Sequence, residues 1–327
     1  MGKENQKIKK IFVNWLPWEK IETASCRLRC YELAPLLNKD KFDIHIDDWD
    51  KDNTISYQAR KADVVIFQKK YWGGLAQLQL QTFKKLGKKI IFDLSDSEWA
   101  DQRRVPNLMR MVELADAFIC STPPIFDWLK SKVGSSKPIT LILDRLDLND
   151  YPKDEMKVHE DKEVPLIGWI GNHNTLVSLY AIRDLMKQVN DIHKFKLRII
   201  CDNHPIINRV KWPIEFEFKE WTLESWKQDL AECDITVNPR ITDEATVGKS
   251  LNKTVTSWLM GIPCVSYHTN PNWEKELLHL MKSKDNRQEN VKKNRTFCEK
   301  EYDMKDSVKQ FENVIQEVMK NDILPTT

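Results

Sequence analysis

Short apolar runs alternate with amphipathic segments along most of this chain, and the alternation occurs twice. In the first half, strands are predicted at 9–15, 42–47, 62–68, 88–94, 117–122 and 139–144. The helical spacing of apolar residues predicts helices between them, at about 25–38, 74–86, 103–115 and 124–132. Fully apolar strands separated by amphipathic helices are typical of a parallel sheet covered on both faces.

The alternation restarts after 148–165, a charged segment that has two prolines and no apolar period, as in a linker between domains. Beyond it, strands are predicted at 166–171, 196–202, 214–218, 234–239 and 263–267, and helices at 175–190, 223–231, about 249–260 and about 286–321. The pattern predicts an α/β protein with two Rossmann-like, doubly wound parallel-sheet domains. Their predicted extents are an N-terminal domain at 1–150, a linker at 151–164, a C-terminal domain at 165–300, and a terminal helix at 301–327 that packs back on the N-terminal domain.

Length and composition agree with two ordinary globular domains. The chain has 327 residues, more than a single core usually contains, and 31% of them are charged. It contains no apolar run of 18 residues and no apolar core of a secretory signal near its start, so we expect a cytoplasmic protein.

Cysteine and histidine spacing argues against metal sites. The seven cysteines are scattered without a C-x-x-C pair, and several lie in apolar runs, which predicts buried reduced thiols. The seven histidines show no H-E-x-x-H spacing, and no G-x-S-x-G elbow is present. These absences disfavour a zinc site and an acyl-transfer enzyme.

The first candidate site is the stretch "GWIGNHNT", 168–175, where an apolar strand runs into a helix. Gly171 would let the backbone approach a ligand, and Asn174 or Thr175 could cap the helix that follows. Asn172 and His173 lie between them. Ligands of open α/β sheets bind beyond the carboxyl ends of strands, near helix N-termini that favour anions. The stretch is therefore a candidate phosphate loop, and an ordinary turn is the alternative.

The second candidate site is the loop that precedes the helix predicted at 249–260. Lys249 is expected in the first turn of this helix, where a cation adds to the positive end of the helix dipole, and Lys253 lies one turn further on. A bound anion such as a diphosphate would offset this repulsion. A solvated lysine face is the alternative.

Other polar residues also follow predicted strands. Asp202 ends one strand and could bind a hydroxyl or cap a turn, while Trp221 could stack on a base or pack in the core, with Thr222 as a helix cap. In the first half, the carboxylates Asp93 and Asp96 follow a strand and could act on hydroxyl protons or form an Asx turn. Arg27 and Arg29 lie at the start of the first predicted helix. They could contact an acceptor anion or form exposed salt bridges.

These features in this order resemble the second domain of glycosyltransferases with the GT-B fold, in the retaining, glycogen-synthase-like branch (glycosyl transferases group 1). The resemblance is carried by "IGWIGNHNT", "LRIICD", "IEFEFKEWTLESWKQDLAECDITVNPR" and "GKSLNKTVTSWLMGIPCVSY". In the first half, "SCRLRCYELAPLL", "KKIIFDLSDSEW" and "ADAFICSTP" are similar to the first domain of the same enzymes.

The resemblance implies a nucleotide-sugar donor held mainly by the second of two facing domains, an acceptor held mainly by the first, and transfer in the cleft without a metal or another cofactor. Lys249 and Lys253 would then neutralise the departing diphosphate. Asp93 and Asp96 are the other candidate catalytic residues, and Arg27 and Arg29 are the candidate contacts on the acceptor side. The implied donor contacts are Gly171, Asn172, His173, Asn174, Asp202, Trp221, Thr222, Arg240, Glu244, Ser250 and Asn252.

The sequence departs from these enzymes at several positions. Many of them carry two Glu separated by seven residues, and here Gly248 and Thr256 occupy those positions. Glu244 lies nearby but at a different spacing. An Arg and Lys pair common after the first strand of the second domain is replaced by Asn172 and His173, and Asp93 to Asp96 lie where many relatives have a His.

The sequence thus favours a glycosyltransferase that moves a sugar from a nucleoside diphosphate donor to an acceptor hydroxyl, with retention by analogy. The acceptor is expected to be a glycan or a lipid-linked sugar. A modified nucleic-acid base is the alternative acceptor, because basic runs such as "KSKDNRQENVKKNR" could contact phosphates. A sugar-nucleotide-binding protein without catalysis is an alternative from another class, and an epimerase of the same fold fits less well.

Overall fold

The computed structural model describes residues 9–47, 57–209, 211–241, 243–266 and 272–320. The chain forms two compact units. Unit 1 comprises Met1–Arg145, Glu244–Ser250 and Met304–Thr327, and unit 2 comprises Leu146–Asp243 and Leu251–Asp303. Both are built around a parallel sheet, so the predicted α/β class with two Rossmann-like domains is confirmed.

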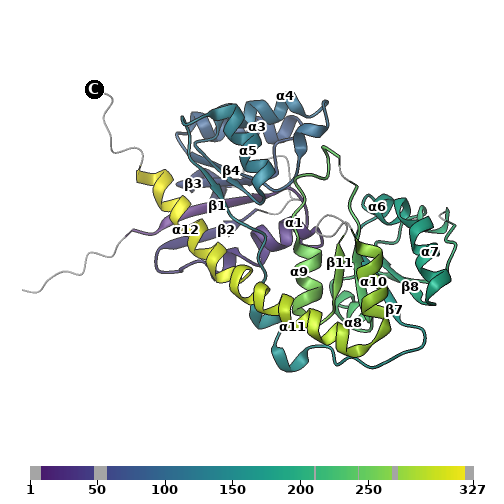
Figure 1. The fold of residues 1–327 in the computed structure, drawn as a ribbon. Helices are drawn as coiled ribbons and strands as arrows, with labels where there is room; N and C mark the ends of the chain where they lie inside the picture. Colours follow the sequence, from purple (N-terminus) through teal and green to yellow (C-terminus); the bar gives the residue numbers. More distant parts are fainter. Residues whose placement is uncertain (1–8, 48–56, 210, 242, 267–271, 321–327) are drawn as a thin grey trace, which may run out of the picture. The chain divides into compact units, whose positions relative to one another are not determined.

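Unit 1 contains a six-stranded sheet in the order β2-β1-β3-β4-β5-β6 (Figure 1). Every strand predicted in the first half is confirmed to within a few residues at its ends. The strands are β1 (Ile11–Pro17), β2 (Phe42–Ile46), β3 (Val64–Gln68), β4 (Lys89–Leu94), β5 (Ala117–Cys120) and β6 (Ile139–Leu141). Their pairing is parallel throughout, as fully apolar strands require.

Successive side chains of β3 point to opposite faces of this sheet, and both faces are buried. Val65 and Phe67 pack in one cluster with apolar residues of the helices α3, α4 and α5. Val64 and Ile66 pack in the other cluster, which includes Phe311 of the helix α12. The Phe311 ring lies 5.3 Å from that of Trp15. The C-terminal helix therefore completes the core of unit 1.

The helices of unit 1 match the sequence except near its first strand. The predicted helix at 25–38 is broken into α1 (Ala24–Cys26), the π-helical η1 (Arg27–Tyr31) and the 3-10 turn η2 (Ala34–Leu36), where Pro35 opens the last turn. One short helix, α2, was not predicted. This short helix is α2 (Tyr57–Lys61), and the longer helices are α3 (Gly74–Lys85), α4 (Val105–Leu114), α5 (Pro123–Val133) and α12 (Met304–Lys320).

Unit 2 contains a five-stranded parallel sheet in the order β11-β10-β7-β8-β9. All of its strands were predicted: β7 (Leu166–Ile170), β8 (Lys196–Cys201), β9 (Phe216–Glu220), β10 (Ile235–Asn238) and β11 (Cys264–Ser266). The chain builds outward from β7 through β8 to β9 and then returns to place β10 on the other side of β7. The direction of strand order thus reverses between β7 and β10.

Helices cover both faces of this second sheet. Trp169 of β7 packs with residues of α7 and α10, while Ile200 of β8 packs with α8. The predicted helix at 175–190 is interrupted at Ile182, and α10 was not predicted. The helices are α6 (Leu176–Ala181), α7 (Arg183–Ile192), α8 (Trp226–Ala231), α9 (Asn252–Leu259), α10 (Trp273–Lys282) and α11 (Lys284–Glu301).

The segment at 151–164, expected to be a linker, packs within unit 2. The Lys157 N–H donates to the Met260 carbonyl at 3.1 Å, and the imidazole of His159 contacts the Gly261 carbonyl through Nε2 at 2.9 Å. Gly261 follows α9 with a φ of +78°, and a Cβ there would lie 2.8 Å from the Lys157 nitrogen. A glycine therefore ends α9 and admits this segment.

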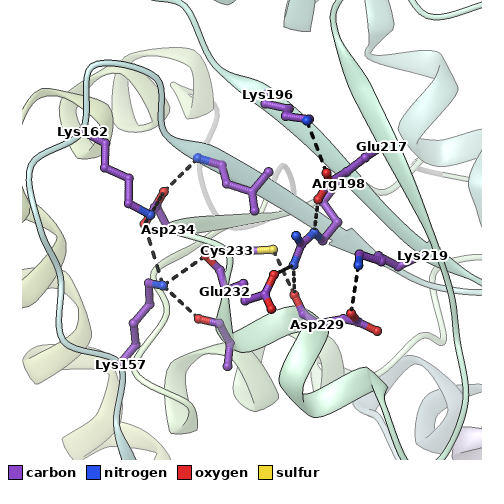
Figure 2. A network of polar contacts seen from close by, with 12 residues as sticks. Lys157, Lys162, Lys196, Arg198, Glu217, Lys219, Asp229, Glu232, Cys233 and Asp234 are labelled. Carbon is purple, nitrogen blue, oxygen red and sulfur yellow. Dashed lines mark hydrogen bonds and ion pairs between the residues drawn. The ribbon is translucent and has the colours of Figure 1, made fainter.

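Charged pairs tie the same segment and the helices to the sheet of unit 2 (Figure 2). Asp234 accepts from the Lys162 ammonium at 2.8 Å and from the Leu166 N–H at 2.8 Å. Arg198, in the middle of β8 and 5% exposed, donates to Glu217 at 2.5 Å and to the Asp229 carbonyl at 2.8 Å. A buried guanidinium is tolerated because its donors are satisfied.

Two further sequence expectations concern cysteines and membranes. All seven cysteines are buried, as predicted, and none is paired in a disulfide. Among the helices that the structure describes, none combines the length and the hydropathy needed to cross a bilayer.

His159 predicts a specific acid sensitivity of unit 2. Burial lowers the pKa of this 3% exposed imidazole to about 4, below its ordinary value of about 6.5. The unfolded chain therefore takes up the proton first, so stability is complete above about pH 6.5, falls as the pH drops toward 4, and then levels off. We expect a loss of about 2 kcal/mol between pH 7.5 and pH 5 by urea unfolding.

The variant His159→Gln keeps a donor for the Gly261 carbonyl and should lose most of this acid-dependent component. The matched change His193→Gln, at the end of α7, should retain it. Equal pH dependence in all three proteins would exclude His159 as its source.

Candidate functional site

The most suitable position for a ligand in unit 2 is the edge where β7 and β10 end. These two strands are neighbours, and strand order reverses between them. Such a switch point leaves a crevice outside the carboxyl ends of the strands, because the connections leave toward opposite faces of the sheet. Residues that follow β7, β8 and β10 therefore decide what this edge can bind.

The turn after β7 is compact, and most of its backbone N–H groups already form hydrogen bonds within the unit. The Gly171 N–H donates to the Ile200 carbonyl at 3.0 Å, and the Asn172 N–H donates to Thr175 Oγ1 at 3.2 Å. The Thr175 N–H in turn donates to Asn172 Oδ1 at 3.1 Å. A Cβ at Gly171 would lie 2.5 Å from the Trp169 ring and 2.6 Å from Thr175 Oγ1. Glycine is required here by close packing.

His173 and Asp202 form a clamp across the ends of β7 and β8. The backbone N–H of His173 donates to Asp202 Oδ1 at 2.6 Å, and His173 Nδ1 hydrogen bonds to Asp202 Oδ2. Cys201 Sγ also lies 3.2 Å from Asp202 Oδ1. Partial burial would raise the pKa of Asp202, but the hydrogen bonds from His173 and Cys201 lower it. Asp202 is thus an ionised acceptor that fixes the histidine ring.

Lys253 supplies a cation to the same edge. It lies in the first turn of α9, its Nζ is 3.4 Å from Thr175 Oγ1, and it sits 5.2 Å from the centre of the Trp169 ring. The cation therefore stacks on the indole and reaches the turn after β7. The prediction that Lys249 opens this helix is wrong, because α9 begins at Asn252 and Lys253 is the lysine in its first turn.

The other predicted donor contacts of unit 2 have more ordinary surroundings. Asn174 is exposed, and Asn252 Oδ1 accepts from the Lys253 N–H at 2.7 Å. Arg240, after β10, is half-buried, and burial lowers its pKa. Thr222 forms a turn with Ser225 at 3.1 Å ahead of α8, whereas Trp221 packs against the cluster around Trp226. The structure gives Trp221 a packing role.

The segment Glu244–Ser250 belongs to unit 1 by its contacts, although it follows β10 in the sequence. The Lys249 ammonium donates to Asp96 Oδ1 at 2.5 Å, and the Gly248 N–H donates to Ser97 Oγ at 2.8 Å. A Cβ at Gly248 would lie 2.4 Å from that oxygen. The predicted donor residues Glu244, Lys249 and Ser250 therefore lie in unit 1, and Lys249 contacts a carboxylate there.

Asp96 is part of a charged cluster that the sequence did not reveal in full. Its carboxylate also accepts from the Lys69 ammonium, which lies 3.2 Å from Glu98. Burial would raise the pKa of Asp96, but Lys69 and Lys249 lower it to about 2. Glu98 further accepts from Tyr71 at 2.6 Å. A carboxylate held this acidic is a weak proton acceptor, which argues against Asp96 as a general base.

Lys69 itself could have been noticed because it directly follows a predicted strand. It has a φ of +52°, a backbone conformation that side chains other than glycine rarely adopt. The carboxylates of Asp96 and Glu98 hold its ammonium, and these contacts offset the cost of the unusual backbone conformation.

Asp93, predicted as a catalytic residue, and Arg29, predicted on the acceptor side, are both interior residues. Arg29 is 1% exposed and Asp93 is fully buried. The guanidinium donates to Asp93 at 2.6 Å, to Asp144 at 2.7 Å and to the Ile142 carbonyl at 2.8 Å. Burial disfavours each charge, but together they satisfy one another. Arg27 differs, since it pairs with Glu32 at 3.3 Å nearer the surface.

Metal coordination has no obvious location in the parts of the chain that the structure describes. Within residues 9–47, 57–209, 211–241, 243–266 and 272–320, no group of three or more His, Cys, Asp or Glu could hold a metal ion.

Comparison with known proteins gives structural neighbours only. No protein family matches the sequence, and no curated protein sequence is significantly similar to it. Anabaena HepE in complex with UDP and glucose has 11% identity and a TM-score of 0.64, over 94% of this chain and 100% of HepE. Sucrose-phosphate synthase from Thermosynechococcus elongatus has 9% identity and a TM-score of 0.68, over 95% of this chain and 100% of the synthase.

A third neighbour is an α-glucosyltransferase in complex with UDP-glucose and DNA containing an abasic site. It has 10% identity and a TM-score of 0.68, over 94% of this chain and 100% of its own. These similarities span nearly the whole chain, so they establish the fold: the two parallel-sheet units have the GT-B architecture. At this level of identity they do not extend to individual residues.

The buried position of Arg29 predicts a large effect on stability. Arg29→Met leaves two buried carboxylates without their partner, so we expect a loss of about 3–5 kcal/mol in urea unfolding. Arg27→Met removes a partly exposed ion pair with Glu32 and should cost about 1 kcal/mol or less. Similar losses for the two variants would contradict the interior role of Arg29.

The packing at Gly171 predicts a second stability difference. Gly171→Ala forces a methyl group against Trp169 and Thr175 and should cost about 1–3 kcal/mol, measured from the urea midpoint. Gly74→Ala is the control, because no atom lies within 4 Å of a Cβ at Gly74 and its φ lies outside the left-handed range that side chains rarely adopt. If Gly171→Ala is as stable as the control, the turn is not packed as described.

Proposed function

We propose that the protein is a glycosyltransferase that moves a sugar from a nucleoside diphosphate donor to an acceptor hydroxyl. The observation that carries this proposal is the Lys253 ammonium beside Thr175, at the edge where strand order reverses in unit 2. Neighbours of the same fold, solved with UDP or UDP-glucose, support a nucleotide-sugar ligand. Retention of anomeric configuration and independence of metal are part of the proposal, by analogy with the resemblance in the sequence.

The chemistry suits a fixed cation at this position. When the bond between the sugar and the diphosphate breaks, negative charge grows on the departing phosphate oxygen. A cation already held in place stabilises that charge more than it stabilises the bound donor, and this difference lowers the barrier. Lys253 is held by its stacking on Trp169 and by its contact with Thr175, so little reorganisation is needed.

Other residues receive roles as parts of the same proposal. Arg240, Asn252 and Asn174 lie in the segments that surround this edge and are proposed donor contacts. Asp202 and the half-buried Trp221 follow the neighbouring strands β8 and β9, on the side proposed for the nucleoside. Lys249 remains a predicted diphosphate contact.

The acceptor is proposed to be a glycan or a lipid-linked sugar. The neighbour solved with DNA supports a nucleic acid as the alternative acceptor. Radiolabelled transfer from UDP-glucose to oligosaccharide, lipid and DNA fractions distinguishes these classes. Binding without transfer or hydrolysis would instead favour a protein that binds sugar nucleotides without catalysis.

Donor binding gives the direct test. UDP-glucose at 100 times its Kd should stabilise the protein by about 2.7 kcal/mol through mass action, seen as a rise in Tm. Lys253→Ala removes a charge-assisted contact and should weaken the affinity for UDP about 10- to 100-fold, measured by isothermal titration calorimetry.

Lys227→Ala is the matched control for this variant. Lys227 lies on α8, also in unit 2, and also places its ammonium near aromatic rings, 4.6 Å from Tyr151 and 5.8 Å from Trp226. Its replacement should leave UDP affinity unchanged. If no nucleoside diphosphate sugar binds the wild-type protein, or if both lysine variants behave alike, the proposed donor site is wrong.

A further inference from the structure

The turn after β7 offers few backbone donors to an anion. The Gly171 N–H donates to Ile200, and the Asn172 N–H donates to Thr175. The His173 N–H donates to Asp202, and the Thr175 N–H donates to Asn172. The helix that follows, α6, has only six residues. A diphosphate bound beside this turn must therefore be recognised mainly by side chains.

His173 is the side chain of this turn that is best fixed for such a contact. Its Nδ1 faces the ionised Asp202, so Nδ1 carries a proton and the ring cannot rotate without losing that bond. About a third of the side chain is exposed, at 33%. No hydrogen bond to its Nε2 is found among the residues that the structure describes. The clamp therefore leaves Nε2 as the ring nitrogen that can contact a ligand.

A second histidine, His204, packs against the His173 ring. The His204 imidazole stacks on His173 with ring centres 4.2 Å apart and planes 11° apart. His204 Nδ1 accepts the Ile206 N–H at 3.2 Å, which leaves it unprotonated. His204 thus packs against one face of the His173 ring, while the carboxylate of Asp202 holds the Nδ1 edge of the same ring.

We propose that His173 is a catalytic residue that protonates the departing diphosphate, with Asp202 as its positioning residue. This inference rests on the proposed function. The bond between sugar C1 and the phosphate oxygen breaks, its electron pair stays on that oxygen, and Nε2 of the imidazolium donates its proton there. The acceptor oxygen forms the new bond to C1 and loses its proton to solvent, and solvent returns a proton to Nε2.

The groups that face His173 determine the pH dependence of this step. They are Asp202 and His204, with Cys201 behind Asp202 and Lys253 at the same sheet edge. Burial raises the pKa of Cys201 to about 12, so this thiol does not titrate near neutrality. Because the proposed step uses a proton carried by the enzyme, the reaction should slow toward alkaline pH.

The test uses the full chain, with UDP as the binding probe and release of UDP from UDP-glucose as the reaction. His173→Gln keeps a donor near Nε2 but has no proton to transfer. We expect its UDP release to fall about 100-fold or more, with the fall at high pH abolished, while its affinity for UDP changes by less than about 10-fold. His193→Gln, at the end of α7, is the control and should behave as wild type.

Asp202→Asn separates a catalytic role of the clamp from a structural one. It keeps an acceptor for the His173 N–H but removes the charge, so the fall in rate should move to lower pH. If His173→Gln fails to fold, the pH profile of Asp202→Asn still tests the catalytic role of His173. Wild-type rates and pH profile in both variants would overturn the proposed role of His173 and leave the proposed function intact. If the wild-type protein neither binds UDP nor releases it from UDP-glucose, the proposed function itself fails, and this inference fails with it.

Discussion

The parallel pairing of β7 with both β8 and β10 determines where polar chemistry can occur in unit 2. Parallel strands all end at one edge, so each strand delivers the residues that follow it to the same place. Gly171 to Thr175, Asp202 and Arg240 reach that edge because they follow β7, β8 and β10. The clamp between His173 and Asp202 is a direct product of this pairing, since it joins residues 29 positions apart in the sequence.

Unit 1 uses the same edge of its sheet differently. There, Asp93 at the end of β4 lies inside the unit and pairs with Arg29, whereas Asp96, two residues beyond the strand, reaches Lys69 and Lys249. The buried pair belongs to the core, because removing either partner would leave an uncompensated charge. The cluster of Asp96, Lys69 and Lys249 is slightly more exposed, with side-chain exposures of 17%, 10% and 42%.

The sequence was sufficient to predict the fold because the local pattern of apolar residues indicates where strands and helices lie and in which order they follow one another. Apolar runs such as 62–68 and 88–94 can only be covered on both faces, and the helices between them force parallel pairing. Elements that depend on tertiary contacts were harder to predict. The helix at 25–38 is broken into short turns, and α10 at Trp273–Lys282 was not predicted.

The candidate site was predicted less well, for a related reason. Position after a strand identified His173, Asp202 and Lys253, and it could have identified Lys69. The same rule could not tell Asp93 from Asp96, because burial depends on the partner at Arg29, 64 residues away. Lys249 was misplaced because the start of α9 depends on packing that the local sequence does not encode.

Gly248 shows how one small residue redistributes the chemistry of such a chain. The resemblance noted in the sequence places a Glu at this position in many relatives. In unit 1, a Cβ at Gly248 would lie 2.4 Å from Ser97 Oγ. A carboxylate side chain is thus incompatible with the packing of Glu244–Ser250 as it stands. The polar groups best fixed for an anion lie instead in unit 2, where Lys253 is held by Trp169 and His173 by Asp202. In each case a neighbouring side chain holds the polar group in one orientation, and a fixed orientation is what electrostatic catalysis requires.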